Sequence, residues 1–124
     1  MIYLDTHVVV WLYAGEIERL GDEVSQLINS HDLLVSPIVR LELQYLYEIQ
    51  RIKDDAQLII TDLSNRIGLR VCDKDFNAVV HEATAVSWTR DPFDRLIVAN
   101  ASLNKAILIS KDQNILANYP LARW

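Results

Sequence analysis

The chain has 124 residues, of which 51% are hydrophobic and 23% charged, and its net charge is −5. This size and composition predict one globular domain over residues 1–124 with a real hydrophobic core. No apolar run reaches the ~20 residues that span a bilayer, and the start MIYLDTH lacks the features of a signal peptide, so we expect a cytoplasmic protein.

Short apolar segments alternate with longer helical ones along the whole chain. Alternation of this kind with short connections predicts an α/β fold with a parallel sheet covered on both faces. In chain order we expect a strand at 1–5, helices at 8–15 and 22–30, a strand at 33–36, helices at 37–51 and 54–66, a strand at 69–73, helices at 75–86 and 93–104, a strand at 106–110, a short helix at 114–118 and an edge strand near 121–124.

Residue types at several boundaries support these elements. Ser36 and Pro37 supply a helix cap and a first-turn proline. The run 93–104 is apolar on nearly all sides, which predicts a central buried helix. The single cysteine, Cys72, excludes an internal disulfide and lies in the apolar stretch LRVCD, so we expect a core thiol.

Five acidic residues lie where one element gives way to the next or where a helix should be buried. They are Asp5 after the first strand, Glu42 inside a helix, Asp91 and Asp94 at the start of the buried helix, and Asp112 after the fourth strand. Ligands of open parallel sheets bind beyond the carboxyl ends of the strands. We therefore expect these side chains to converge in one crevice there.

Helix capping is the competing explanation for the aspartates. Asp at an N-cap satisfies free backbone N–H groups and contributes roughly 0.5–2 kcal/mol. Asp91 precedes Pro92, Asp112 precedes a short helix, and Asp5 or Thr6 could cap the first helix. Taken singly, each aspartate is better explained as a cap than as a catalytic group.

Glu42 does not fit the capping explanation, because it lies well past the start of its helix. Its neighbours at helical spacing, Ile38, Tyr45 and Ile49, form an apolar stripe. A glutamate on such a stripe either lies at its edge with the carboxylate in water or is buried with a partner such as a cation. The sequence leaves both arrangements open.

Converging carboxylates need a compensating charge. Two of them ~4 Å apart repel by about 4 kcal/mol at an effective dielectric constant of about 20, so protons or a cation must be taken up. Mg²⁺ or Mn²⁺ suits an open cage of oxygen ligands and can support phosphodiester hydrolysis. His7, His31 and His81 form no metal-binding pair, so we do not expect zinc. The negative net charge argues mildly against nucleic-acid binding unless such a cation neutralises part of it.

Four segments in series resemble the PIN-domain family, and within it the VapC-type toxin ribonucleases of type II toxin–antitoxin systems. They are MIYLDTHVVVWL, SPIVRLELQYL, RDPFDRLIVANA and LISKDQNI, which together span nearly the whole chain. The resemblance implies a three-layer α/β/α sandwich with a central, mainly parallel sheet. It also implies an endoribonuclease toxin that depends on Mg²⁺ or Mn²⁺ and hydrolyses RNA phosphodiester bonds.

The resemblance assigns roles to particular residues. The metal-site and catalytic acids would be Asp5, Glu42 and Asp94, with Asp112 as a fourth acid of more variable role. Asp91 would lie at the rim of the site. Thr6 and Ser110 would orient the acids by hydrogen bonds, although each could equally be a strand-end cap.

Partners are also implied by the resemblance. VapC-type toxins are neutralised by a small VapB-like antitoxin and commonly form homodimers or toxin–antitoxin hetero-oligomers. Aromatic residues on early helices could line a groove for an antitoxin tail or could simply be core: Trp11, Tyr13, Tyr45 and Tyr47. Basic residues near the acids could bind RNA phosphates or form surface ion pairs, with Arg95 and Lys111 as the substrate-binding candidates beside Arg40 and Arg90.

Other functions share parts of this pattern. A haloacid-dehalogenase-like phosphatase needs a second aspartate two places after the first, where this chain has His7. A phospho-receiver domain needs an acidic pair after the first strand and an acceptor aspartate after the third, which Asp73 and Asp75 match weakly. Two further alternatives are a PIN-domain nuclease in RNA processing without a toxin role and a PIN domain that only binds. The second is disfavoured because all four acids are present.

Overall fold

A five-stranded sheet forms the centre of the computed structural model, which describes residues 1–124. The strands are β1 (Ile2–Leu4), β2 (Leu33–Val35), β3 (Arg70–Val71), β4 (Ile107–Ile109) and β5 (Ala122–Arg123). Their order is β3-β2-β1-β4-β5, and all neighbours are parallel. The chain therefore builds outward from β1 to β3 and then returns to add β4 on the other side of β1, so the order reverses between β1 and β4.

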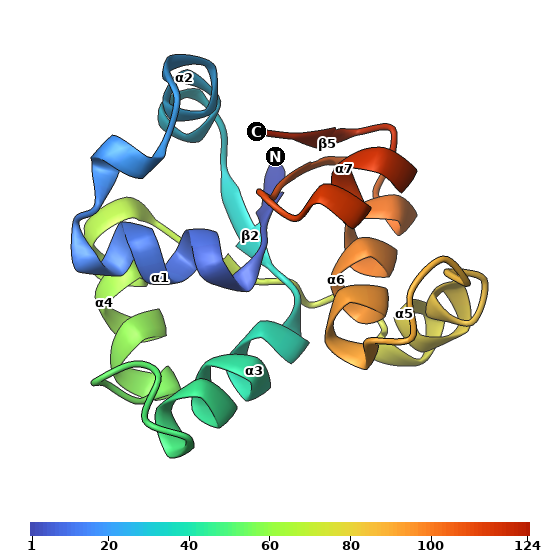
Figure 1. Ribbon diagram of the computed structural model, residues 1–124, viewed down its shortest axis with the longest axis horizontal. Coiled ribbons are helices and arrows are strands. Elements are labelled where there is room, and N and C mark those ends of the chain that lie inside the picture. Colours follow the sequence, from blue (N-terminus) through green and yellow to red (C-terminus); the bar gives the residue numbers. More distant parts are fainter.

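Helices cover both faces of this sheet. In Figure 1, α1, α2 and α4 lie on one side of β1 and β2, and α5 and α6 lie on the other. The predicted α/β/α sandwich with a parallel sheet is thereby confirmed. None of the helices has the length and hydropathy of a membrane span. The helices are α1 (Thr6–Ala14), the short 3₁₀ helix η1 (Ile17–Arg19), α2 (Asp22–Ser30), α3 (Pro37–Glu48), α4 (Ala56–Ile67), α5 (Phe76–Ala83), α6 (Pro92–Leu103) and α7 (Gln113–Asn118).

One cluster of 28 buried residues forms the main core between the sheet and the helices. Every residue of β1 is buried, as expected for a central strand. Helix α6 is buried continuously from Ile97 to Ala101, which confirms the predicted central helix. Cys72 is also buried, and its Sγ accepts a hydrogen bond of 3.1 Å from the Tyr3 hydroxyl, so the predicted core thiol is confirmed.

Several helix boundaries follow from local signals in the sequence. The Ser36 side chain caps α3 by accepting from the backbone N–H of Ile38, and Pro37 takes the first helical position. Gly15 and Gly68 end α1 and α4 with φ of 74° and 72°, a left-handed conformation that glycine adopts without strain.

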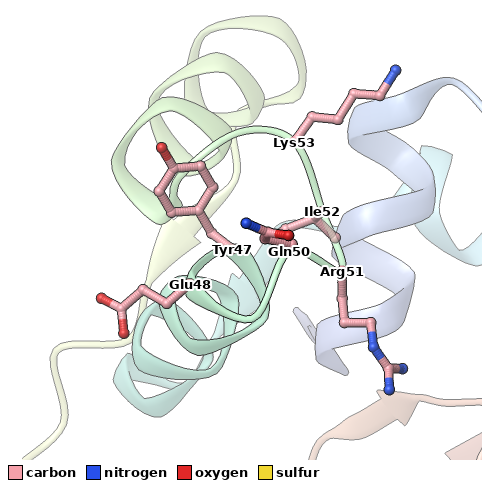
Figure 2. Close-up of a pocket in the computed structure, with 6 residues that line it drawn as sticks. All are labelled: Tyr47, Glu48, Gln50, Arg51, Ile52 and Lys53. Carbon is pink, nitrogen blue, oxygen red and sulfur yellow. The ribbon is translucent and has the colours of Figure 1, made fainter.

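Other boundaries differ from the predicted ones. Helix α1 begins at Thr6 rather than residue 8, because Asp5 caps it. Helix α3 ends at Glu48 rather than near residue 51, because Gln50 has a φ of 63°, which no α-helical residue adopts. Figure 2 shows the tight turn that follows. Helix α5 ends at Ala83 rather than near residue 86, and η1 was not predicted.

Candidate active site

The site begins where the strand order of the sheet reverses. Leu4 at the end of β1 pairs with Ile109 at the end of β4, so Asp5 and Ser110 leave the sheet side by side. The Asp5 backbone N–H donates to the Ile109 carbonyl at 3.0 Å. The Ser110 hydroxyl donates to the Asp5 carboxylate at 2.6 Å. Ligands of open α/β sheets bind at such a reversal point.

Asp5 is a buried carboxylate, with only 7% of its surface exposed. It caps α1 by accepting from the Thr6 backbone N–H at 2.8 Å, and its other oxygen accepts from Ser110. Burial raises the pKa of Asp5 and outweighs these two hydrogen bonds, which favour the charged form. The fold therefore holds this carboxylate rigidly in place at an electrostatic cost.

Glu42 lies beside Asp5, although Glu42 belongs to α3 and Asp5 lies between β1 and α1. The Thr6 hydroxyl, which is fully buried, donates a hydrogen bond to the Glu42 carboxylate. Thr6 thus contacts both acids, one through its backbone and one through its side chain. Burial raises the pKa of Glu42, and repulsion by Asp5 adds to this effect.

The predicted apolar stripe around Glu42 is not the buried face of α3. Tyr45 and Ile49 are 49% and 43% exposed, whereas the buried residues of this helix are Val39 and Leu43. Glu42 lies beside the packed face rather than within it, half-buried, with Thr6 as its partner.

Helix α6 brings two more acids through its first turn. Asp91 caps the helix: its Oδ1 accepts from the backbone N–H groups of Phe93 at 2.8 Å and Asp94 at 3.4 Å. Asp94 is half-buried, and no protein donor binds its carboxylate. Its burial and then repulsion by the neighbouring acids, Asp91 first, raise the pKa of Asp94 to about 7.

Asp112 completes the group from the segment that follows β4. Its Oδ1 caps α7 by accepting from Asn114 at 2.9 Å and Ile115 at 3.0 Å. The Asp112 backbone N–H in turn donates to the Ser110 hydroxyl at 3.1 Å. Ser110 therefore joins the backbone of Asp112 to the carboxylate of Asp5.

The five acids surround a single hollow of about 360 Å³. The predicted convergence in one crevice is therefore confirmed, and the three aspartates that cap helices are among the residues that line it. The residues around the hollow are Asp5, His7, Val8, Trp11, Glu42, Asp91, Asp94, Lys111 and Asp112.

The chemistry of this donor set fits Mg²⁺ or Mn²⁺. Five carboxylates face one lysine, and hard oxygen ligands are those that these ions prefer. No three acidic, histidine or cysteine side chains are arranged to hold one ion together. Mg²⁺ usually keeps several waters and binds only one or two carboxylates directly, so it does not need such a preformed trio.

Three residues of the hollow were not singled out by the sequence as members of the site: His7, Val8 and Trp11. His7 and Trp11 lie four residues apart on α1, with ring centroids 6.3 Å apart. The electrostatic interaction with His7 lowers the pKa of both Asp5 and Glu42 and so counters part of the burial effect. The spacing of His7 and Trp11 could have revealed this pair, because residues i and i+4 of a helix that begins at Thr6 share one face.

Of the four basic candidates, only Lys111 lines the hollow. The Arg95 guanidinium instead donates to the carbonyls of Ala83 and Thr84, both at 3.2 Å, at the end of α5. Arg90 donates to a carbonyl of its own loop at 2.7 Å. Arg40 is exposed on α3 and lines a separate hollow between α3 and α4.

The four aromatic candidates lie in four different surroundings rather than around one groove. Trp11 packs against Trp124, with ring centroids 5.5 Å apart. The Tyr13 hydroxyl donates to Asp54 at 2.6 Å. Tyr45 lies against Phe93, and Tyr47 lines a hollow at the turn after α3 (Figure 2).

Comparison with known proteins agrees with this fold. The family model of the PIN domain matches residues 2–120. Ribonuclease VapC22 of Mycobacterium tuberculosis is 36% identical over 133 aligned positions, covering 99% of this chain and 98% of that protein. The chain therefore belongs to the PIN-domain family. The VapC22 match over nearly the full length of both proteins places it among the VapC-type members.

Two solved structures share the fold. A toxin–antitoxin complex from Klebsiella pneumoniae matches with a TM-score of 0.69 and 16% identity, covering 100% of this chain and 97% of that one. VapBC2 from Rickettsia felis, bound to a DNA fragment from its promoter, matches with a TM-score of 0.68 and 21% identity, covering 99% and 98%. At these identities the likeness supports the architecture.

Proposed function

We propose that this chain is an endoribonuclease toxin of the VapC type, in which residues 1–124 act as one nuclease domain. The observation that carries the proposal is the hollow at the strand-order reversal, where carboxylates from α1, α3 and α6 converge with the cap of α7. The identity of 36% to a ribonuclease over nearly its full length supports RNA as the substrate.

The cation in this proposal is Mg²⁺ or Mn²⁺, with Asp5, Glu42 and Asp94 as its main ligands and Asp112 as a fourth. When bound, such an ion activates water for attack on phosphorus and stabilises the leaving oxygen. Asp91 would act at the rim of the site, where it also fixes the first turn of α6.

The remaining residues position these acids and the substrate. Ser110 and Thr6 keep Asp5 and Glu42 in fixed orientations through the hydrogen bonds described above. Lys111 places a positive charge beside the acids, where it would attract an RNA phosphate. Arg95 is not included, because its guanidinium is bound to the end of α5.

The proposed partner is a VapB-like antitoxin that neutralises the nuclease, and the chain forms a homodimer or a toxin–antitoxin hetero-oligomer. The fold neighbours come from toxin–antitoxin complexes, which supports this choice. The competing function is a PIN-domain nuclease in RNA processing without a toxin role. Cleavage and growth assays separate the two.

Cleavage of RNA should require the cation. The purified protein is expected to cut single-stranded RNA in Mg²⁺ or Mn²⁺, to lose this activity in EDTA, and to regain it when excess Mg²⁺ is added, because the acids cannot activate water alone. Gel analysis of a labelled oligonucleotide measures this. Undiminished cleavage by metal-stripped protein would contradict the proposed chemistry.

Growth should depend on the balance between the chain and its antitoxin. Expression of the chain alone is expected to arrest growth, and co-expression of the small gene beside it should restore growth. The Asp5→Asn variant at equal abundance is the control, since it should be harmless. Normal growth with abundant active nuclease would favour the RNA-processing alternative.

A further inference from the structure

An aromatic pair lies next to the acids but outside the proposed cation site. Tyr45 follows Glu42 by three residues on α3, and Phe93 precedes Asp94 in the first turn of α6. Their ring centroids are 6.3 Å apart, with 31° between the ring planes. Residues three apart on a helix are surface neighbours, so Tyr45 lies beside Glu42, although neither aromatic ring lines the acidic hollow itself.

Packing does not account for Tyr45. The residue is 49% exposed, and its hydroxyl has no protein partner. The hydroxyls of the other tyrosines at packed positions are all bound: Tyr3 to Cys72, Tyr13 to Asp54 and Tyr119 to the Ala106 carbonyl. Phe93 is half-buried and supports one side of the Tyr45 ring. The pair therefore presents an aromatic surface to solvent.

Electrostatics favour an aromatic contact for RNA at this place. The chain carries a net charge of −5, and Lys111 is the only lysine or arginine that lines the hollow. Attraction to phosphates, which usually dominates nucleic-acid affinity, is therefore weak here. Stacking of a base on an aromatic ring does not depend on the sign of the net charge and works for every base.

Trp11 is the large aromatic side chain that lines the hollow itself, but other side chains already contact its ring. Its ring packs against Trp124 at 5.5 Å between centroids, and the Arg19 guanidinium lies 5.4 Å from the ring centroid. Lys111 Nζ lies 6.0 Å from it. Of the two aromatic groups, the pair on α3 and α6 is thus the more accessible to a base.

We propose that Tyr45 and Phe93 form a stacking platform for one unpaired nucleobase of the RNA substrate, beside the phosphate that is cut. This inference rests on the proposed nuclease function and names the substrate form that the site accepts. A base inside a duplex is already stacked and has no free face, so the platform selects single strands or loops.

The test compares substitutions of Tyr45 in steady-state cleavage of a single-stranded RNA oligonucleotide. Tyr45→Leu keeps the apolar bulk but removes the aromatic face, and it is expected to raise KM about tenfold with little change in kcat. Tyr45→Trp should keep KM near the native value. The matched control is Tyr47→Ala, because Tyr47 is 40% exposed on the same helix and lines the separate hollow of Figure 2.

A binding measurement separates stacking from a structural effect. The inactive Asp94→Asn protein is mixed with the same oligonucleotide carrying 2-aminopurine at successive positions near the cut. We expect the protein to quench the fluorescence of 2-aminopurine at one position. The double variant that also carries Tyr45→Leu should not quench it. If the Tyr45→Leu substitution changes neither KM nor the quenching, the platform is overturned. It is also overturned if this substitution weakens binding of the antitoxin and leaves RNA binding unchanged. If the native protein shows no metal-dependent cleavage, the proposed nuclease function itself fails.

Discussion

The Asp94→Asn variant is expected to cleave RNA about 10²–10³-fold more slowly than the native protein and yet to unfold at a higher temperature when metal is absent. The loss of rate follows from removing one of the proposed cation ligands. The gain in stability follows from the raised pKa of Asp94, about 7, which reports that burial and repulsion by the other acids disfavour its charge. Asparagine has nearly the same shape without that charge.

The size of the stability gain can be estimated from the same shift. A rise in the pKa of Asp94 from 3.8 to about 7 would correspond, without solvent screening, to about 4 kcal/mol in the free energy of unfolding. Asp94 is only half-buried, so solvent screening reduces this to about 1–2 kcal/mol. Loss of the favourable interaction with the α6 dipole costs about 0.3–1 kcal/mol and does not reverse the sign. The melting temperature in EDTA should therefore rise by several degrees.

A matched control comes from Asp22, which is an exposed acid in the first turn of α2, away from the hollow. Asp22→Asn removes a charge from a comparable helix position without relieving any crowding, so it should leave cleavage unchanged and lower stability slightly. Calorimetry and cleavage rates of both variants check the pair of effects. An Asp94→Asn protein that is less stable in EDTA, or that cleaves RNA at the native rate, would remove Asp94 from the proposed site.

The positions of Asp5, Asp91 and Asp112 could be predicted from the sequence because helix starts mark them. Capping and site formation were competing explanations for these three residues, and in the structure each of them caps a helix and also lines the acidic hollow. In this fold α1, α6 and α7 all begin at the carboxyl edge of the parallel sheet, so their N-caps are brought to the same edge. Each carboxylate has two oxygens, and in Asp91 and Asp112 the cap uses one of them.

The buried face of α3 could not be predicted in the same way. Its sequence, PIVRLELQYLYE, carries apolar residues at most positions, so both the stripe through Tyr45 and the stripe through Val39 and Leu43 are consistent with a helix. Contacts with α4 and α6 decide between them, and these depend on the order of the whole fold. The exposed aromatic surface at Tyr45 is therefore a property of the tertiary structure alone.

The misplaced role of Arg95 has a simpler cause. Arg95 follows Asp94 in the sequence and was a substrate-binding candidate because it is a basic residue near the acids. Successive residues of a helix point about 100° apart, however, and do not face each other. Arg95 accordingly reaches the end of α5, where two free carbonyls accept its N–H groups. Within a helix, a residue that follows a site residue in the sequence therefore need not belong to the site.

In the absence of metal, the free energy of unfolding is expected to fall markedly as the pH rises from 5 to 8. The folded state raises the pKa of Asp94 to about 7, and it also raises those of Asp5 and Glu42. The folded protein therefore binds more protons than the unfolded chain across this range, so the free energy of unfolding decreases with pH. The stabilising contribution is complete below the unfolded pKa of about 4 and is lost as pH passes the folded values.

Added Mg²⁺ or Mn²⁺ should reverse this loss, because the cation replaces the protons that the acids have released. At a concentration 100 times its Kd, one bound ion stabilises the fold by about 2.7 kcal/mol. Melting curves in EDTA and in Mg²⁺ at pH 5, 6, 7 and 8, with NaCl added to equal ionic strength, separate specific binding from screening. The Asp94→Asn protein should show a flatter pH profile and a smaller response to Mg²⁺. Stability in EDTA that increases between pH 5 and 8 would show that the five carboxylates do not crowd one another, and the argument for a cation between them would then fail.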